Sequence, residues 1–253
     1  MLYGIGTSAL GAHVQQMRLD TIANNLANIN TTGYRGDRIS FKSVLAGAVG
    51  GSQGGNVYES ISAPTIDRVS FDTSLGAMED TGNPLDLAIE GNGFFTVRSL
   101  ENWKNYYTRA GNFTFNSSGQ VVTQDGKYAL TSAGGEPITL AEGVTAGNLL
   151  IDEAGGIYMG DTQIGAVGLV DFDDYTKLRK FGNTLFENTG ANGRTAAEAN
   201  IRQGVIEGAS VNPIEELVAM IEGMRTLETN LQMIRFQDST LEKAVNDLGR
   251  LPR

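Results

Sequence analysis

The chain has 253 residues, of which 33 are Gly, one is His and none is Cys. The lack of Cys excludes disulfides, thiolate metal sites and cysteine nucleophiles, and the single His excludes any site that needs two imidazoles. The formal net charge is −10, and residues 47–213 carry all of it, because they hold twenty acidic and ten basic side chains. Since this acidic middle repels phosphates, nucleic acid and anionic membranes are poor partners.

Targeting and membrane signals are not evident in the sequence. No apolar run approaches the roughly 18 residues that a membrane span needs. The first basic residue is Arg18, and no long apolar core accompanies it, so we expect no cleavable signal peptide. Composition alone therefore favours the cytoplasm.

The N-terminal residues have the spacing of a helix with one apolar stripe. Apolar residues recur at intervals of three and four, and small side chains dominate the first half. The run Asn30-Thr31-Thr32-Gly33 is expected to end this helix. The positions of the stripe are Leu2, Ile5, Ala9, Ala12, Gln16, Leu19, Ala23 and Leu26.

A longer helix is predicted at the C-terminal end. Asn212 can cap it, Pro213 suits its first position, and Glu215 stands three residues after the cap. Gly249 and Pro252 end the pattern, so about 37 residues form a rod of roughly 55 Å. One heptad position holds Leu217, Met224, Leu231, Asp238 and Val245, and the other holds Met220, Leu227, Ile234, Leu241 and Leu248.

Two apolar positions per heptad make a narrow stripe, which is typical of a coiled-coil seam rather than of a broad globular face. We therefore predict that the apolar residues of both stripes, Asp238 and Gln16 excepted, form helix–helix and subunit interfaces. The alternative is that both helices simply pack on the domain between them.

The middle of the chain is predicted to be rich in strands. Residues 47–55 are Gly-rich and are expected to form a flexible linker, and residues 56–82 mix strand-like pieces with turns. Residues 84–205 have short β-rich runs at hairpin spacing, which favours a compact antiparallel domain. The runs are Phe94–Arg98, Tyr106–Arg109, Asn112–Phe115, Gln120–Thr123 and Gln163–Val170, with turns at 116–119, 125–126 and 154–156. The fold class is thus α+β.

We predict no catalytic residues, no cofactor and no metal. The acidic cluster Asp171-Phe172-Asp173-Asp174 could hold a hard cation, but it is better explained as a solvated turn, since no Gly follows where a calcium loop needs one. Asp86 and Glu90 could act as paired carboxylates, yet nothing places them across a cleft. His13 is expected on a helix surface without a catalytic partner.

Four blocks of the sequence carry a family resemblance: residues 23–34, 83–95, 107–113 and 203–208, the last leading into the C-terminal helix. In this order they closely resemble the signatures of flagellar basal-body rod and hook proteins. The matching positions are Asn24, Asn25, Asn28, Gly33, Asp86, Gly93, Phe94, Arg109, Gly111, Glu216, Arg225, Glu228 and Asn230. The sequence departs from the pattern at Ala209–Asn212 and at Leu227, where many relatives have Ser-Asn-Val and an aromatic residue, respectively.

The resemblance implies a structural protein of the bacterial flagellum. In this family the terminal helices pair in the inner layer of a tubular polymer, and a β-rich domain forms the outer layer. Subunits leave the cytoplasm through the flagellar type III export apparatus without a cleaved signal peptide, and they assemble in the cell envelope as the rod. The implied partners are copies of the chain, other rod proteins, hook-side or ring proteins and the export apparatus. This implication replaces the cytoplasmic expectation.

The resemblance also suggests boundaries and a place in the rod. Residues 1–33 and 209–253 are predicted to form a helical polymerisation domain, residues 34–83 an intermediate segment with strands, and residues 84–208 the β-rich outer domain. The run Ile206-Glu207-Gly208 favours the proximal rod, and the distal rod is the alternative.

Two other function classes remain open on sequence grounds. An enzyme could be built on the acidic β domain, although the residues for catalysis are scarce. A monomeric envelope-binding module could fold its helices back on its own sheet, and its helical content would then be independent of concentration.

Overall fold

A computed structural model describes residues 2–46, 61–140, 149–196 and 199–248. The chain divides into two compact units. The helical unit comprises Met1–Ala27, Asp37–Ser70 and Asn212–Arg253, and the β unit comprises Asn28–Gly36 and Phe71–Val211. The predicted intermediate segment 34–83 is divided between the two. The predicted α+β class, with paired terminal helices and mainly antiparallel strands between them, is confirmed.

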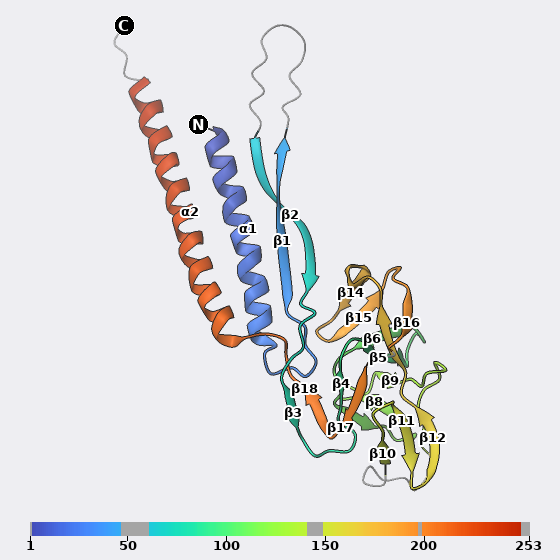
Figure 1. Cartoon of the computed structure of the whole chain (residues 1–253). Helices are drawn as coiled ribbons and strands as arrows, with labels where there is room; N and C mark the ends of the chain where they lie inside the picture. Colours follow the sequence, from blue (N-terminus) through green and yellow to red (C-terminus); the bar gives the residue numbers. More distant parts are fainter. Residues whose placement is uncertain (1, 47–60, 141–148, 197–198, 249–253) are drawn as a thin grey trace, which may run out of the picture. The chain divides into compact units, whose positions relative to one another are not determined.

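The helical unit is built on α1 (Leu2–Ala27) and α2 (Pro213–Leu248), which lie side by side (Figure 1). They are antiparallel, because Asn25 meets Glu216 near one end and Gly11 meets Asn230 further along. Gly223 is buried, and a Cβ there would come within 2.8 Å of Leu19, so this glycine permits a close approach of the helices.

The start of α2 is as the sequence predicts. The amide of Ile214 donates to Asn212 Oδ1 at 3.1 Å, and Asn212 Nδ2 donates to Glu215 Oε1 at 3.0 Å. These bonds satisfy a donor that every helix start leaves free.

Two long strands, β1 (Asp37–Ala46) and β2 (Ile61–Phe71), pair with each other, and β1 also contacts α1 (Figure 1). The flexible linker predicted over residues 47–55 lies outside the described residues. No helix in the described residues is long and apolar enough to cross a membrane.

The β unit is centred on a nine-stranded antiparallel sheet with the path β14-β15-β6-β5-β9-β8-β7, which β13 and β16 join through β5. Its strands are β5 (Phe94–Ser99), β6 (Asn105–Thr108), β7 (Phe113–Phe115), β8 (Val121–Thr123), β9 (Tyr128–Leu130), β13 (Leu169–Phe172), β14 (Leu178–Phe181), β15 (Leu185–Asn188) and β16 (Gly193–Thr195). A 3₁₀ turn, Tyr175–Lys177, precedes β14.

Smaller antiparallel pairings complete the unit. They are β3 (Met78–Asp80) with β18 (Val205–Glu207), β4 (Leu87–Glu90) with β17 (Asn200–Gln203), and the three-stranded β10 (Leu149–Ile151), β11 (Gly156–Met159) and β12 (Thr162–Ala166). One long strand predicted over 163–170 is wrong: the chain forms β12 and then β13. Gly168 lies between them, where a Cβ would meet the backbone oxygen of Ser132 at 2.7 Å.

Two apolar clusters form the core of the β unit. The larger one gathers side chains from β4, β5, β10 and β17, among them Leu87, Phe95 and Ile201. The smaller one is aromatic and is centred on Phe94, Phe172 and Phe186. The central strand β5 is buried at almost every position, with the pattern of a strand covered on both faces, whereas β16 at the margin of the sheet is exposed throughout.

Candidate functional site

A buried amide joins three parts of the helical unit. Asn25, near the end of α1, accepts a hydrogen bond from the amide of Asp37 at 2.8 Å and donates to the carbonyl of Asp37 at 3.0 Å. Its Nδ2 also donates to Glu216 Oε1, in the first turn of α2, at 3.0 Å. One side chain therefore holds the end of α1, the start of β1 and the start of α2 together.

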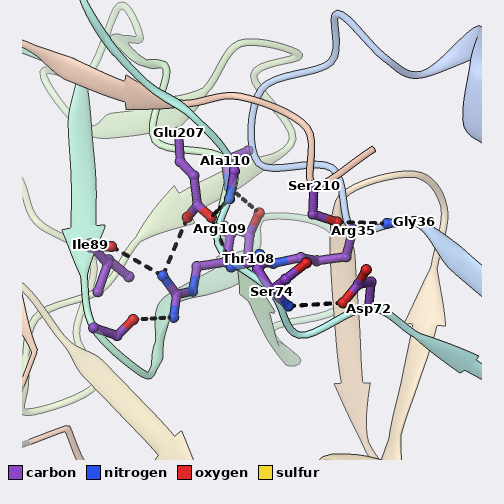
Figure 2. Close-up of polar contacts among 12 residues, drawn as sticks. Arg35, Gly36, Asp72, Ser74, Ile89, Thr108, Arg109, Ala110, Glu207 and Ser210 are labelled. Atoms are coloured by element: carbon purple, nitrogen blue, oxygen red, sulfur yellow. Dashed lines mark hydrogen bonds and ion pairs between the residues drawn. The ribbon is translucent and has the colours of Figure 1, made fainter. Parts of the chain in front are cut away.

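A second polar joint lies inside the β unit and consists of Arg35, Arg109 and Glu207 (Figure 2). Arg35 Nη2 lies 2.9 Å from Glu207 Oε1, and Arg109 Nη1 lies 3.3 Å from Glu207 Oε2. The side chains are only 3%, 4% and 1% exposed, respectively. Because buried charges are costly unless paired and hydrogen-bonded, this cluster must be well satisfied to persist.

Backbone groups provide further partners of this joint. Arg109 donates to the carbonyls of Ile89 and Gly91 at 3.1 and 2.7 Å. Arg35 donates to the carbonyl of Ser74, and the amide of Gly76 donates to Glu207 Oε1 at 2.9 Å. The joint thus connects the loop that follows α1 to the segment before β3, to β4 and to β18 (Figure 2).

Burial and pairing act on the two guanidinium groups in opposite directions. Burial lowers the pKa of Arg35 and of Arg109, and the carboxylate of Glu207 raises both. Because a guanidinium group holds its proton so strongly, both arginines stay charged at neutral pH. The joint therefore carries two positive charges and one negative charge, and Asp72 adds a further attraction for Arg35.

Glycines allow the backbone to pass close to this joint. Gly33 has a φ of +66°, and a Cβ there would overlap the backbone of Ala110. A Cβ on Gly111 would overlap the carbonyl of Leu87. Gly93 has a φ of +129° and would come within 2.9 Å of the Ala196 side chain. At these positions the positive φ or the close approach permits only glycine.

Three other signature residues support the same region. Asp86 accepts hydrogen bonds from Thr81 Oγ1 at 2.6 Å and from Asn83 Nδ2 at 3.0 Å, which holds the turn before β4. Phe94 lies under the guanidinium of Arg109, with Cζ 5.5 Å from the ring centroid. Asn28 Oδ1 accepts from Asn183 Nδ2 at 2.9 Å, and so connects the loop after α1 to the turn before β15.

A third feature is an exposed apolar face on α2. Ile214, Leu217, Val218, Ile221 and Met224 lie within three turns of helix and are each 47–72% exposed. Leu231, Met233 and Phe236 continue the exposed apolar character further along α2. An exposed row of large apolar side chains is a candidate surface for protein contacts.

The two heptad positions of α2 differ in the structure. Met220, Leu227, Ile234 and Leu241 are half-buried, whereas Leu217, Met224 and Leu231 are exposed. In the stripe of α1, Ala12 is buried, Leu19 and Leu26 are half-buried, and Ala9 and Ala23 are exposed. The side chains of Leu2, Ile5, Val245 and Leu248 lie outside the described residues. The half-buried positions face the partner helix, and the exposed ones are available for other contacts.

The remaining signature residues lie on helix surfaces. Asn24, Arg225 and Glu228 are exposed, and Asn230 is half-buried beside Gly11. Among the described residues, no three His, Cys, Asp or Glu side chains gather as a metal site would require.

Each residue of the acidic cluster has a local structural role. Asp171 pairs with Arg194 at 3.0 Å and accepts from Tyr175 Oη at 2.6 Å. Asp173 accepts from the amide and the side chain of Asn192, and Asp174 caps the 3₁₀ turn. His13 is exposed, as is Glu90, whereas Asp86 is buried in its own turn.

Sequence reasoning missed Arg35 and Glu207 as site residues. Both stood beside quoted motifs, Arg35 directly after the first block and Glu207 within the last. The signal that could have found them is a charged residue in an apolar or Gly-rich run. A lone acid in a strand that becomes buried, such as Glu207, needs a cation as its partner.

Comparison with known proteins shows which family this chain resembles. Three family models match: "Flagella basal body rod protein" over residues 5–35, "Flagellar hook protein FlgE/F/G D1 domain" over 88–159 and "Flagellar basal body rod FlgEFG protein C-terminal" over 202–248. The chain is 32% identical to the flagellar basal-body rod protein FlgG of Bacillus subtilis over 270 residues, covering 97% of this chain and 99% of the relative. The chain belongs to the flagellar basal-body rod protein family.

Other rod proteins are similarly close. The FlgF proteins of Caulobacter vibrioides and Mesorhizobium japonicum are 32% and 28% identical, each covering 92% of both chains. Membership in the rod family confirms the expectation of a structural subunit of the flagellar basal body rather than an enzyme. FlgF and FlgG relatives have similar identity to this chain, so sequence identity does not distinguish a proximal from a distal position in the rod.

Proposed function

We propose that this rod protein is an axial subunit that polymerises through its terminal helices and transmits motor torque to the hook. The observation that carries the proposal is the exposed apolar face of α2 from Ile214 to Met224. Burying one such side chain is worth about 1.5–3 kcal/mol, so a row of five can hold a subunit contact. A second copy that buries this face repeats the contact along the rod.

The geometry of the helical pair favours an open polymer. α2 presents large side chains outward, whereas the exposed positions of the α1 stripe, Ala9 and Ala23, are small. A ridge of large residues fits a surface of small residues on a different copy, which makes the contact heterologous. Heterologous contacts that do not close generate helical filaments, as a drive shaft requires.

Ile221→Asp tests the polymerisation surface. Ile221 is 52% exposed, so the monomer should keep its helicity, measured by circular dichroism. Assembly should fail, because a charge would be buried in each subunit contact. In cells that carry the variant we expect no hooks and no motility.

Thr226→Asp is the matched control, since Thr226 is an exposed residue of α2 outside the apolar row. It should assemble normally. Normal basal bodies containing Ile221→Asp would instead remove the helical surface from the proposal and favour a monomeric envelope module.

We further propose the proximal part of the rod as the position of this chain. The support is the run Ile206-Glu207-Gly208, followed by Pro213-Ile214-Glu215, which is more similar to proximal rod proteins. The distal rod is the alternative, favoured by the match to B. subtilis FlgG, which extends over nearly the full length of both chains.

Quantitative mass spectrometry of purified hook–basal bodies separates these positions. A proximal subunit should be present in fewer copies than the distal rod protein of the same particles. If this chain is the most abundant rod component, it is the distal subunit. Its absence from intact particles would defeat the axial role.

Export and partners complete the proposal. We expect the chain to pass the flagellar export apparatus without a cleaved signal peptide, and to contact other rod proteins and hook-side or ring proteins in the periplasm. Recovery of the tryptic peptide that ends at Arg18, with its N-terminus intact, from purified basal bodies tests the export route. A mature N-terminus beyond Arg18 would contradict it.

A further inference from the structure

The only Trp of the sequence stands at the tip of a tight turn in the β unit. Trp103 lies between β5 and β6 and is 65% exposed. Tryptophan is the side chain that contributes most often to the centre of protein interfaces, because it buries a large apolar area at a small entropic cost. An exposed Trp leaves a large apolar area in contact with water, which is unfavourable unless a partner covers it.

The turn holds Trp103 in a conformation that its backbone disfavours. Its φ is +59°, and no other non-Gly residue in the described ranges has a positive φ. A bulky residue in this region costs about 1–2 kcal/mol, so the surrounding turn must enforce it.

Ser99 is the centre of the enforcing contacts. Its buried Oγ accepts hydrogen bonds from the amides of Glu101 and Asn102 at 3.3 and 3.4 Å. Its carbonyl accepts from the amide of Trp103 at 3.1 Å, and Asn102 Oδ1 accepts from the amide of Lys104 at 3.0 Å. These hydrogen bonds hold the backbone of the turn, and the Trp103 and Lys104 side chains are exposed on it.

The same β unit contains a cavity of about 210 Å³ whose lining suits an indole. This volume is below the range of small-molecule sites and fits a single large side chain. Tyr128 and Leu185 provide apolar and aromatic surface, and Asn112 and Asp125 provide acceptors for an indole N–H. Within the described residues, the side chains of Asn112, Gln124 and Thr184 have no hydrogen-bonding partner, so they can serve a guest.

We propose that Trp103 of one copy inserts into this cavity of a second copy, with Lys104 placed against Asp125 of that copy. Trp103 and the cavity both belong to the β unit, so each copy carries both. The positive charge of Lys104 complements the carboxylate of Asp125, which lines the cavity. The contact is heterologous, so it continues from copy to copy. The inference rests on the proposed axial function, to which it adds a contact between β units that is independent of the helices.

The absence of native Cys makes the contact directly testable. One full-length chain carries Lys104→Cys and keeps Trp103 as the anchor. A second, differently tagged chain carries Gln124→Cys at the rim of the cavity. Because the two cysteines are on separate chains, a disulfide between the tags can only be intermolecular. The two chains are co-expressed in flagellated cells in place of the native protein, and basal bodies are oxidised mildly and resolved on a non-reducing gel.

We expect a mixed disulfide between the two tagged chains, and loss of that species when Trp103→Ala is added to the first chain. Leu75→Ala, which truncates another exposed apolar residue of the β unit, is the matched control and should leave cross-linking unchanged. Chains present in basal bodies without the mixed disulfide would overturn the inference and leave the axial function intact.

The purified full-length chains provide a second measurement that does not depend on flagellar assembly. Removing an interface Trp should weaken association about thirtyfold, so Trp103→Ala should require a correspondingly higher concentration for cross-linking. If the chain is absent from basal bodies, the axial function fails, and the purified mixture still decides the contact. Equal cross-linking of wild-type and Trp103→Ala chains, or only Lys104→Cys homodimers, would overturn it.

Discussion

Glu207 forms ion pairs with Arg35 and Arg109 inside the β unit. Because it is buried, its loss should affect stability more than the loss of an exposed acid. At 1% exposure it has exchanged water for Arg35, Arg109 and the amide of Gly76. A buried ion pair adds little net stability compared with apolar residues of the same shape. Its removal is costly, because the partners remain buried without a counter-charge. The joint is therefore best understood as a specific connection between the loop after α1 and the strands, rather than as a source of stability.

Glu207→Gln should lower the free energy of unfolding by about 3–5 kcal/mol, because both guanidinium groups lose their counter-charge in a buried site. Urea unfolding followed by circular dichroism measures this. Glu187→Gln is the matched control: it breaks an ion pair with Arg179, whose side chain is 70% exposed, and should cost less than about 1 kcal/mol. Equal losses in the two variants would contradict the role of the joint.

Tyr175 provides a test through pH. Burial, together with its hydrogen bond to Asp171, raises the pKa of Tyr175 from 10 to about 12. A raised pKa means that the folded state favours the neutral phenol, so the contribution to stability is complete below pH 10 and is lost as the pH rises to about 12. Tyr175→Phe should remove this part of the alkaline decline between pH 10 and 12. An unchanged slope in urea titrations over that range would contradict it.

The two heptad positions of α2 differ in burial, although both are mainly apolar in the sequence. Ile234 is half-buried in the helical pair, whereas Leu231 is 43% exposed. An isolated helical pair of this kind is stabilised mainly by its apolar contact, since helix propensity alone is marginal. We therefore expect the two positions to control different events, Ile234 the folding of the pair and Leu231 the proposed contact with another copy.

Ile234→Asp should reduce the helical circular dichroism signal of the monomer, because it places a charge between α1 and α2. Leu231→Asp should leave that signal unchanged and prevent rod assembly instead. Circular dichroism at low concentration, combined with counts of basal bodies in cells, distinguishes the two effects. Identical behaviour of the variants would show that α2 does not divide its faces in this way.

The chain as a whole consists of two units whose residues are interleaved in sequence. The β unit takes Asn28–Gly36 from the N-terminal part of the chain and Phe71–Val211 from the rest. The short first segment brings Gly33 and Arg35 to the buried joint. The unit is therefore incomplete without the loop that follows α1, even though 34 residues of the helical unit separate its two pieces.

Truncated chains test this organisation. A fragment of residues 28–211 should unfold cooperatively at the urea midpoint of the β unit in the full chain, because it keeps every partner of Glu207. A fragment of residues 71–211 should have a clearly lower midpoint, because it lacks Arg35. Equal midpoints for the two fragments would mean that the loop contributes no stability.

Local patterns were sufficient for the two helices and for several of the antiparallel strands. The heptads, the cap at Asn212 and the hairpin turns depend on neighbours a few residues away, and the structure confirms the two helices and the antiparallel strands that these patterns predict. The single strand expected over 163–170 was wrong. At Gly168 the chain passes so close to the backbone of Ser132 that a Cβ would not fit, and Ser132 is distant in sequence. The order of the four sequence blocks likewise indicates the family without reference to the fold.

The joints and the division of helix faces could not be derived from such patterns. Arg35, Arg109 and Glu207 are far apart in the chain, and a charged residue in sequence has the same appearance whether it is buried or solvated. In the same way, both heptad positions of α2 are apolar, and only the placement of α1 decides which of them remains exposed. Burial depends on which distant segments meet in the fold. The order of residues was therefore enough to predict the helices and the family, whereas the buried joint and the exposed face of α2 depend on the tertiary structure.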